Sequence, residues 1–445
     1  MASTTRIPAS SVSTYPIFAV NFVGTLGFSV VLPFLVFLVT RWGGNGFVYG
    51  VIGATYSAFQ LVGAPVLGRL SDAVGRRRVL LLSQLGTALS WGIFVIAFWL
   101  PDQALAVVDS GVVGRFSVTW PLIAVFVARA CDGATGGNIS VANAYLADIT
   151  DEESRGAYFG RMAVAANLGF ILGPAIAVLL GATRFGELGP VLAALVISLV
   201  ATLLILFWLP EVAPCVLTSD PRPADVARVL GQEQKHCFEI AGARKPRLRS
   251  LLRLESVSLL LGVYFLVMLG FNLYYVSFPV HAATSLRWSG REIGIYYAVM
   301  SLLMATVQGP LLGRASRVWG DRALAIAGSL ILAASFLFFT SRHAAWIYAG
   351  VVLLALGNGL MWPSVVSLLS LAAGRERQGA VQGLAGSAGA IASILGLLVG
   401  GVLYASVGSL VFSLASLTIL AVFLLTLRLP AGPGLVDRIK GALAR

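Results

Sequence analysis

Charged residues are scarce in this chain of 445 residues, at 11% of the total, whereas apolar residues make up 58%. Soluble globular proteins have roughly a quarter of their residues charged, so this composition excludes that class. Cysteine and histidine are also rare, with three of each. The cysteines stand singly, without the paired spacing of a disulfide framework or a metal site. Because phosphate-binding glycine loops are missing too, we expect no enzyme, no metal and no cofactor.

Long apolar runs are what the sequence has in abundance. Windows of about 20 residues, the length that crosses a bilayer as a helix, can be placed twelve times. We therefore predict an all-α polytopic membrane protein with twelve transmembrane helices. The predicted spans are residues 15–40, 47–67, 79–100, 119–147, 157–183, 190–209, 254–280, 292–313, 323–341, 346–373, 380–405 and 410–428.

The basic residues give the orientation. If the N-terminus is cytoplasmic, most of the 31 lysines and arginines fall in cytoplasmic segments, as the positive-inside rule requires. We expect an integral plasma (inner) membrane protein with both termini in the cytoplasm. This distribution also accounts for the net charge of +12 without nucleic-acid binding, which we do not expect.

One long polar connection divides the spans six and six. The predicted domains are an N-terminal six-helix bundle (1–209), a cytoplasmic central loop (210–253), a C-terminal six-helix bundle (254–430) and a cytoplasmic tail (431–445). Within the central loop, residues 223–241 are compatible with a short amphipathic helix on the membrane surface or with a disordered tether.

The two halves repeat each other. The stretch GRLSDAVGRRRVLLL (Gly68 to Leu82) lies between two apolar runs, and GRASRVWGDRALAIA (Gly313 to Ala327) lies between two others. Aligning Gly156 with Gly379 also places Gly136 on Gly359 and Gly173 on Gly396. Such repeats in transporters imply two homologous six-helix bundles with a substrate site between them.

The first of these stretches predicts a tight turn at the membrane surface. Gly68 and Gly75 permit the turn, Arg76 and Arg77 lie in a basic cluster, and Asp72 is the acid beside them. The spacing resembles the loop between helices 2 and 3 of the major facilitator superfamily. That resemblance implies a conformational latch, in which the acid sits near the positive N-terminal end of helix 11. The alternative is a turn that only fixes the orientation of the chain.

The fourth predicted span carries the chemistry. Among the 19 acids, Asp132 is the one deep within a predicted span, and Arg129 lies three residues before it. At about 100° per residue, Arg129, Asp132, Gly133, Gly136, Ser140 and Asn143 share one face of a helix. Charge inside a membrane is costly, so proton coupling by Asp132 with Arg129 is the functional interpretation. A neutral pair that only holds helix packing is the alternative.

The fifth predicted span resembles the signature of exporting antiporters. Gly169, Gly173 and Pro174 form a G-x-x-x-G-P pattern, which favours close helix packing and a bend. Together with GATGG and AYLADITDEESRG in the fourth span, it is similar to the drug/proton antiporter branch and above all to the tetracycline exporters.

The sequence departs from that branch at its known charged positions. The acids of its spans 1, 3 and 9 and a histidine near span 8 align here with Gly24, Ser90, Ile331 and Leu286. The resemblance therefore implies an exporter whose proton coupling would run through Asp132, and it leaves tetracycline itself in doubt as substrate. His281 is a secondary titratable candidate.

In this superfamily, spans 1, 4, 7 and 10 line the substrate cavity. The resemblance therefore implies that the polar and aromatic side chains of these spans are candidates for substrate binding. The candidates, with two glutamines from adjoining spans, are Asn21, Gln60, Asn143, Asn272, Tyr275, Gln308, Asn358 and Trp362. As a set they suit a lipophilic or amphipathic compound better than a highly charged one, because Arg129 is the one arginine placed securely in a span.

These observations predict a secondary transporter that exports an organic compound in exchange for protons. The transmembrane proton gradient would supply the energy, and the protein would act as a monomer in the bilayer. The alternatives are a uniporter or proton symporter for a sugar, lipid or other metabolite on the same fold, and a membrane protein of this fold that has lost transport and acts as an assembly or sensing partner.

Overall fold

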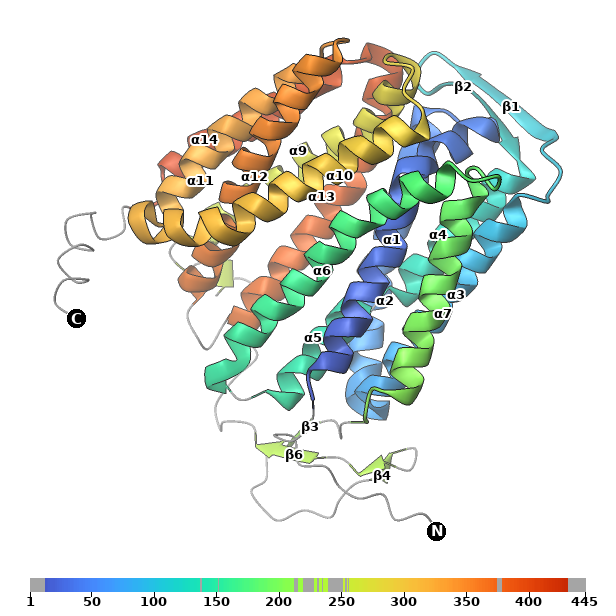
Figure 1. The fold of residues 1–445 in the computed structure, drawn as a ribbon. Helices are drawn as coiled ribbons and strands as arrows, with labels where there is room; N and C mark the ends of the chain where they lie inside the picture. Colours follow the sequence, from blue (N-terminus) through green and yellow to red (C-terminus); the bar gives the residue numbers. More distant parts are fainter. Residues whose placement is uncertain are drawn as a thin grey trace. The chain divides into compact units, whose positions relative to one another are not determined.

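The computed structural model describes residues 13–136, 138–150, 152–211, 215–218, 228–229, 232–233, 235–238, 251–252, 254, 256–373 and 378–430. Apolar runs form helices because a helix satisfies all of its own backbone hydrogen bonds, as a bilayer demands. The helices, in chain order (Figure 1), are α1 (Tyr15–Arg41), α2 (Gly46–Val74), α3 (Arg76–Ala97), α4 (Trp120–Thr135), α5 (Asn138–Ile149), α6 (Glu152–Gly181), α7 (Leu188–Phe207), α9 (Val257–Thr284), α10 (Gly290–Thr306), the π-helical turn η2 (Val307–Leu311), α11 (Leu312–Phe338), α12 (Ala344–Ala373), α13 (Gln378–Val407) and α14 (Leu410–Leu427).

Ten helical segments in the described part of the chain are long and apolar enough to cross a membrane. One of them, Gly290–Phe338, contains two predicted spans, which the non-helical Gly320 separates. The predicted span 119–147 corresponds to α4 and α5, which are too short to be counted singly. With these two adjustments the helices correspond to the twelve predicted spans.

The turn between α2 and α3 differs from the one predicted. Gly68 lies inside α2, and the helix continues to Val74. Only Gly75 breaks the helix, with a φ of 106° that suits glycine. The prediction that Gly68 permits the turn is therefore wrong, because a glycine inside a helix is tolerated at modest cost. Gly320, with a φ of 76°, is the equivalent break in the second half.

Contacts divide the chain into two units. The first comprises Met1–Leu35, Thr55–Leu105 and Thr119–Arg244, and the second comprises Val36–Ala54, Ala106–Val118 and Lys245–Arg445. In the first unit α3 packs against α4 and α7; in the second, α11 packs against α12 and α14, and α9 against α13. Figure 1 shows α11, α12 and α14 side by side.

Equivalent arginines hold the last helix of each half. Arg77, two residues after the Gly75 break, donates from Nε to the carbonyl oxygen of Ile205 at 3.2 Å, near the end of α7. Arg322, in the same position of the second repeat, donates from Nε to the carbonyl of Leu429 at 2.8 Å, just beyond α14. The sequence repeat thus has the same structural role twice.

Small β elements accompany the helices. β1 (Ala104–Ser110) and β2 (Gly114–Thr119) form a two-stranded sheet between α3 and α4. In the central loop, the described residues form β3 (Cys215–Thr218), β4 (Arg228–Val229), β5 (Gln232–Glu233) and β6 (Lys235–Phe238). The last three strands lie where an amphipathic helix over 223–241 was one of two alternatives, so that helix is wrong for these residues. Apart from residues 210–211 and 251–252, the remainder of the loop lies outside the described residues, as does the tail 431–445.

Candidate substrate and proton site

Arg129 and Asp132 lie on α4 in the interior of the first unit. Arg129 is 4% exposed and Asp132 is 5% exposed. The Arg129 Nη1 atom lies 3.5 Å from the Asp132 Oδ2 atom, at the outer limit of a hydrogen bond. Thr87 on α3 donates its hydroxyl to the other carboxylate oxygen, Oδ1, at 2.8 Å. A carboxylate can accept about four hydrogen bonds, so Asp132 keeps acceptor capacity beyond these two contacts.

Four aromatic rings surround the Arg129 guanidinium. Its Cζ atom lies 5.7 Å from the ring centroids of Phe28, Tyr56 and Trp91 and 5.6 Å from that of Phe94. These rings come from α1, α2 and α3. Each is within the range of about 6 Å in which a ring face attracts a cation. The rings stabilise the buried charge of Arg129 while its contact with the carboxylate stays long.

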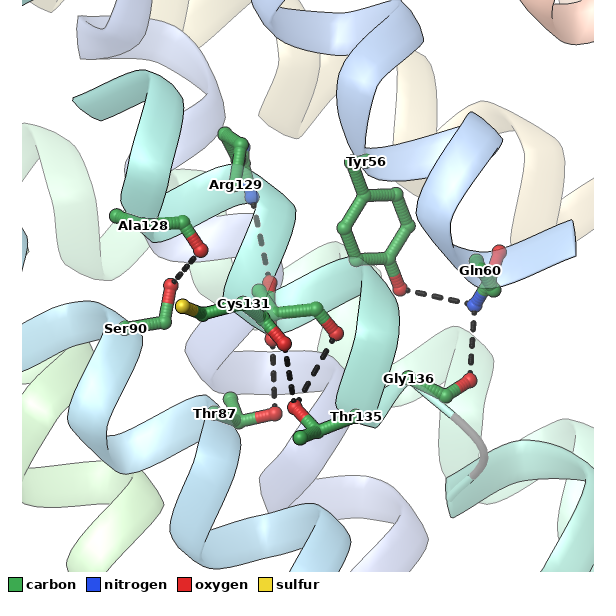
Figure 2. Close-up of polar contacts among 10 residues, drawn as sticks. Tyr56, Gln60, Thr87, Ser90, Ala128, Arg129, Cys131, Thr135 and Gly136 are labelled. Carbon is green, nitrogen blue, oxygen red and sulfur yellow. Dashed lines mark hydrogen bonds and ion pairs between the residues drawn. The ribbon is translucent and has the colours of Figure 1, made fainter. Parts of the chain in front are cut away.

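The helix of the fourth span breaks immediately after this pair. Gly136 ends α4, and α5 begins at Asn138. Gln60 on α2 donates its side-chain amide to the carbonyl of Gly136 at 3.1 Å and to the hydroxyl of Tyr56 at 3.0 Å, as Figure 2 shows. Such a break inside a membrane is tolerated where neighbouring groups satisfy the freed backbone or where the break borders a cavity.

The break changes the polar face predicted for the fourth span. A single helical line from Arg129 to Asn143 requires a continuous helix, and this prediction is wrong because the helix is interrupted at Gly136, whose ψ of 34° is not helical. Asn143 is half-buried on α5. The side chain of Ser140 lies outside the described residues.

A cavity of about 270 Å³ opens beside the pair, entirely within the first unit. Its walls combine the Asp132 carboxylate with amides, hydroxyls and aromatic rings. The lining residues are Val20, Asn21, Gly24, Thr25, Phe28, Tyr56, Gln60, Leu80, Gln84, Thr87, Trp91, Asp132, Gly136, Ala142, Phe170 and Ile205. Binding pockets of small molecules commonly have this mostly apolar character with a few placed polar groups.

The structure brings two of the predicted cavity residues, Asn21 and Gln60, into this lining, and Asn143 is not part of it. Asn21 also donates to the carbonyl of Met162 on α6 at 3.0 Å. Gly24, where the tetracycline exporters carry an acid, lines the same cavity.

The five other predicted cavity residues lie in the second unit, where each packs against its neighbours. Asn272 donates to the Ser393 hydroxyl at 3.1 Å, and Trp362 packs on Tyr264 with ring centroids 4.9 Å apart. Tyr275 stacks on Phe271, and Asn358 contacts Met304. Gln308 lies near Gly359, where an added Cβ atom would be 3.8 Å from its Cγ atom. Their role in substrate binding stays a prediction.

Arg76, one of the residues predicted for the latch, is held by α5. Arg76 is 8% exposed, and its Nε atom lies 2.8 Å from Oδ2 of Asp148 on α5. Its Nη1 atom donates to Ser71 at 2.6 Å. The side chain of Asp72 lies outside the described residues, so the latch itself stays a prediction.

The glycines of the predicted fifth span are points of close approach within α6. An added Cβ atom at Gly169 would lie 2.8 Å from the carbonyl of Phe22 on α1, and one at Gly173 would collide with Ser29. Pro174 lies inside the same helix. Packing of α6 on α1 therefore depends on these two glycines.

The aromatic cage and Thr87 were not predicted from the sequence. Trp91 and Phe94 are three residues apart on one helix, but no spacing links them to Phe28, Tyr56 or Arg129. Only the packing of three helices around Arg129 brings them together. The signal available in the sequence was the arginine itself, since a buried cation requires compensating neighbours.

A helical membrane protein with two repeats and a buried charged pair beside a cavity has the construction of a transporter. The sequence matches the Major Facilitator Superfamily over residues 17–259 and 260–442, and the chain belongs to that superfamily. The two matched segments confirm the twelve-helix fold in two repeats.

Individual relatives agree with this assignment. The tetracycline resistance protein, class C, of Escherichia coli is 29% identical over 379 residues, which cover 85% of each chain. The human major facilitator superfamily domain-containing protein 10 is 30% identical over 363 residues, covering 80% of this chain and 72% of that protein. These similarities confirm the resemblance to the drug-exporter branch.

Two crystal structures share the fold. The human organic anion transporter MFSD10 (TETRAN) superposes with a TM-score of 0.64 at 23% identity, covering 95% of this chain and 100% of that one. The nucleoside transporter NupG superposes with a TM-score of 0.65 at 12% identity, covering 93% of this chain and 98% of that one.

Proposed function

We propose that this protein is a secondary active transporter that exports a lipophilic or amphipathic organic compound in exchange for protons by alternating access. The observation that carries the proposal is the Asp132 carboxylate, which lines a largely apolar and aromatic cavity and contacts Arg129 only at 3.5 Å. The tetracycline resistance proteins among the relatives support export of such a compound.

Asp132 would couple the proton to transport because the charge of the site differs between the ionised and the protonated acid. The ionised carboxylate balances the charge of Arg129, whereas the protonated acid leaves Arg129 with its aromatic rings alone. A change of this kind biases the equilibrium between two conformations by the difference in interaction energy. The proton gradient would be the energy source, with no cofactor.

We propose the setting of this activity from the charge distribution. The protein would lie in the plasma membrane, the inner one in a cell with two, as a monomer with both termini in the cytoplasm. The Gly75 turn, with Asp72, Arg76 and Arg77, would lie on the cytoplasmic side and act as the conformational latch.

One observation favours a second candidate, a proton symporter. An anionic compound could take the place of Asp132 beside Arg129 once that acid is protonated, and compound and proton would then bind together. One structural neighbour is an organic anion transporter. The two candidates differ in the direction of proton movement relative to the compound. A uniporter would move no proton with the compound.

Inverted membrane vesicles with an imposed proton gradient test the proposal. We expect the wild type to accumulate a compound from a panel of lipophilic drugs and amphipathic metabolites, and Asp132→Asn to lose accumulation by about a hundredfold or more while remaining folded. The loss follows from removal of the titrating group. Dissipating the gradient with an ionophore is the control.

Undiminished gradient-driven accumulation by Asp132→Asn would refute the coupling role of the acid. Accumulation only with the opposite gradient would identify the symporter, and equal equilibration by both proteins would identify a uniporter.

A further inference from the structure

Two buried hydrogen-bond donors near the cavity have no acceptor among the residues that the structure describes. Trp91 on α3 is 1% exposed and lines the cavity, and its indole Nε1 has no partner among the described residues. The same holds within the described chain for the Nε atom of Arg129, whose guanidinium lies 5.7 Å from the Trp91 ring centroid.

Such donors are rarely left unpaired. More than nine tenths of buried polar groups in proteins have a partner, and an exception calls for an explanation such as a water or a ligand. Most other polar groups around Arg129 are engaged. Ser90 donates to the carbonyl of Ala128 at 2.6 Å, Thr87 donates to Asp132, and Gln60 donates to Tyr56 and Gly136. The cavity beside Trp91 is where an acceptor can enter.

The charge of the site restricts what that acceptor can be. Arg129 and Asp132 together are neutral when the acid is ionised, so an anion near Trp91 would meet the carboxylate on the same cavity wall. A cation without an oxygen atom would leave both donors unpaired. A neutral oxygen satisfies the indole N–H without disturbing the pair.

Building on the proposed function, we propose that Trp91, with Arg129 beside it, forms a donor subsite for a neutral oxygen acceptor of the transported compound. The chemical class is a lipophilic aromatic compound that carries a carbonyl or hydroxyl oxygen. Its apolar rings lie against Phe28, Tyr56 and Phe170, and its oxygen accepts a hydrogen bond from Trp91.

The subsite makes Trp91 a specificity-determining residue. Loss of its N–H weakens the binding of compounds that carry the oxygen. The affinity for compounds without the oxygen stays unchanged, because the aromatic wall remains in place. A site that hydrogen-bonds its substrate discriminates strongly against analogues that lack the group.

The test replaces the N–H without changing the shape of the side chain. Trp91→β-(3-benzothienyl)alanine has sulfur where the indole has N–H, and Trp120, which is 48% exposed, receives the same substitution as the control. Wild type and both variants are purified into lipid nanodiscs. Equilibrium binding is measured for two radiolabelled probes, tetracycline, which carries carbonyl and hydroxyl oxygens, and tetraphenylphosphonium, which is aromatic and has no oxygen.

We expect the Trp91 variant to bind tetracycline about tenfold more weakly, the effect of one hydrogen bond. Tetraphenylphosphonium affinity stays within about twofold of that of the wild type, as do all affinities of the Trp120 variant. Unchanged tetracycline affinity, or an equal loss for both probes, overturns the subsite. Failure of the wild type to bind tetracycline overturns it as well.

This experiment separates the subsite from the proposed function because binding is measured without a gradient. Gradient-independent transport with intact discrimination by Trp91 would remove the antiport mechanism and leave the subsite. Proton-coupled transport without that discrimination would remove the subsite and leave the antiport mechanism.

Discussion

The Arg129 charge is stabilised by one distant carboxylate and four aromatic rings, and this balance has a measurable consequence. Removing one partner of a buried ion pair costs about 3–5 kcal/mol because the other charge stays buried. We therefore expect Arg129→Met to be strongly destabilising, since it leaves Asp132 uncompensated. We expect Arg129→Met with Asp132→Asn to recover a substantial part of that loss, and thermal unfolding at a fixed scan rate in nanodiscs measures both.

Asp132→Asn alone is the reference for this comparison. It leaves Arg129 among the rings of Phe28, Tyr56, Trp91 and Phe94, so its effect on stability should be the smaller of the two single substitutions. If the double variant is no more stable than Arg129→Met, the pair does not balance the charge and the rings carry it alone.

At this scale the sequence predicts the pair but not its surroundings. Two ionisable residues three positions apart in an apolar run require each other, and local spacing is enough to see this. The surrounding rings belong to three helices whose relative rotation depends on packing, which a single sequence does not contain. For the same reason, nothing in the sequence distinguishes Trp91 from the other aromatic residues.

Among the elements, the close approach of α2 and α4 depends on Gly133. An added Cβ atom there would collide with the backbone carbonyl of Tyr56, and backbone cannot give way as a side chain can. We expect Gly133→Ala to lower stability by about 1–3 kcal/mol, as overpacking does. Thermal unfolding measures the loss, and transport should fall with it because Gly133 adjoins Asp132.

Gly92 on α3 is the matched control, because an added Cβ atom there meets no described atom within 4 Å. Alanine is the better helix former, so Gly92→Ala should be neutral or stabilising by up to about 1 kcal/mol. Equal effects at both positions would show that helix propensity, and not packing on α2, decides the outcome.

The helices themselves follow closely from the lengths of the apolar runs. The first predicted span, 15–40, matches α1 (Tyr15–Arg41). The predictions are wrong at glycines, because a glycine can either continue a helix or end it. Gly68 continues a helix that it was expected to end, whereas the helix of the fourth span breaks at Gly136, which was expected to be helical. Composition alone does not separate these cases, because neighbouring groups such as Gln60 decide whether a break is satisfied.

For the whole molecule, the duplicated arginines allow the repeat to be tested as a structural principle. Arg77 and Arg322 each donate to backbone carbonyls at the end of the last helix of their half. Replacing either with alanine leaves buried or partly buried carbonyls without a partner, which costs about 1–3 kcal/mol. Because the two contacts share no residues, we expect Arg77→Ala and Arg322→Ala to have similar effects that add within about 0.5 kcal/mol in the double variant.

Arg69 and Arg314 provide the controls, since both are exposed and occupy equivalent positions of the two repeats, each directly after the first glycine of its motif. Their alanine variants should unfold within about 0.5 kcal/mol of the wild type, as surface substitutions do. Thermal unfolding of the six proteins at one scan rate measures the set. If only Arg77→Ala is destabilising, the second copy of the motif has kept its sequence without its structural role. The two halves are then equivalent in fold but not in the contacts that hold their last helices.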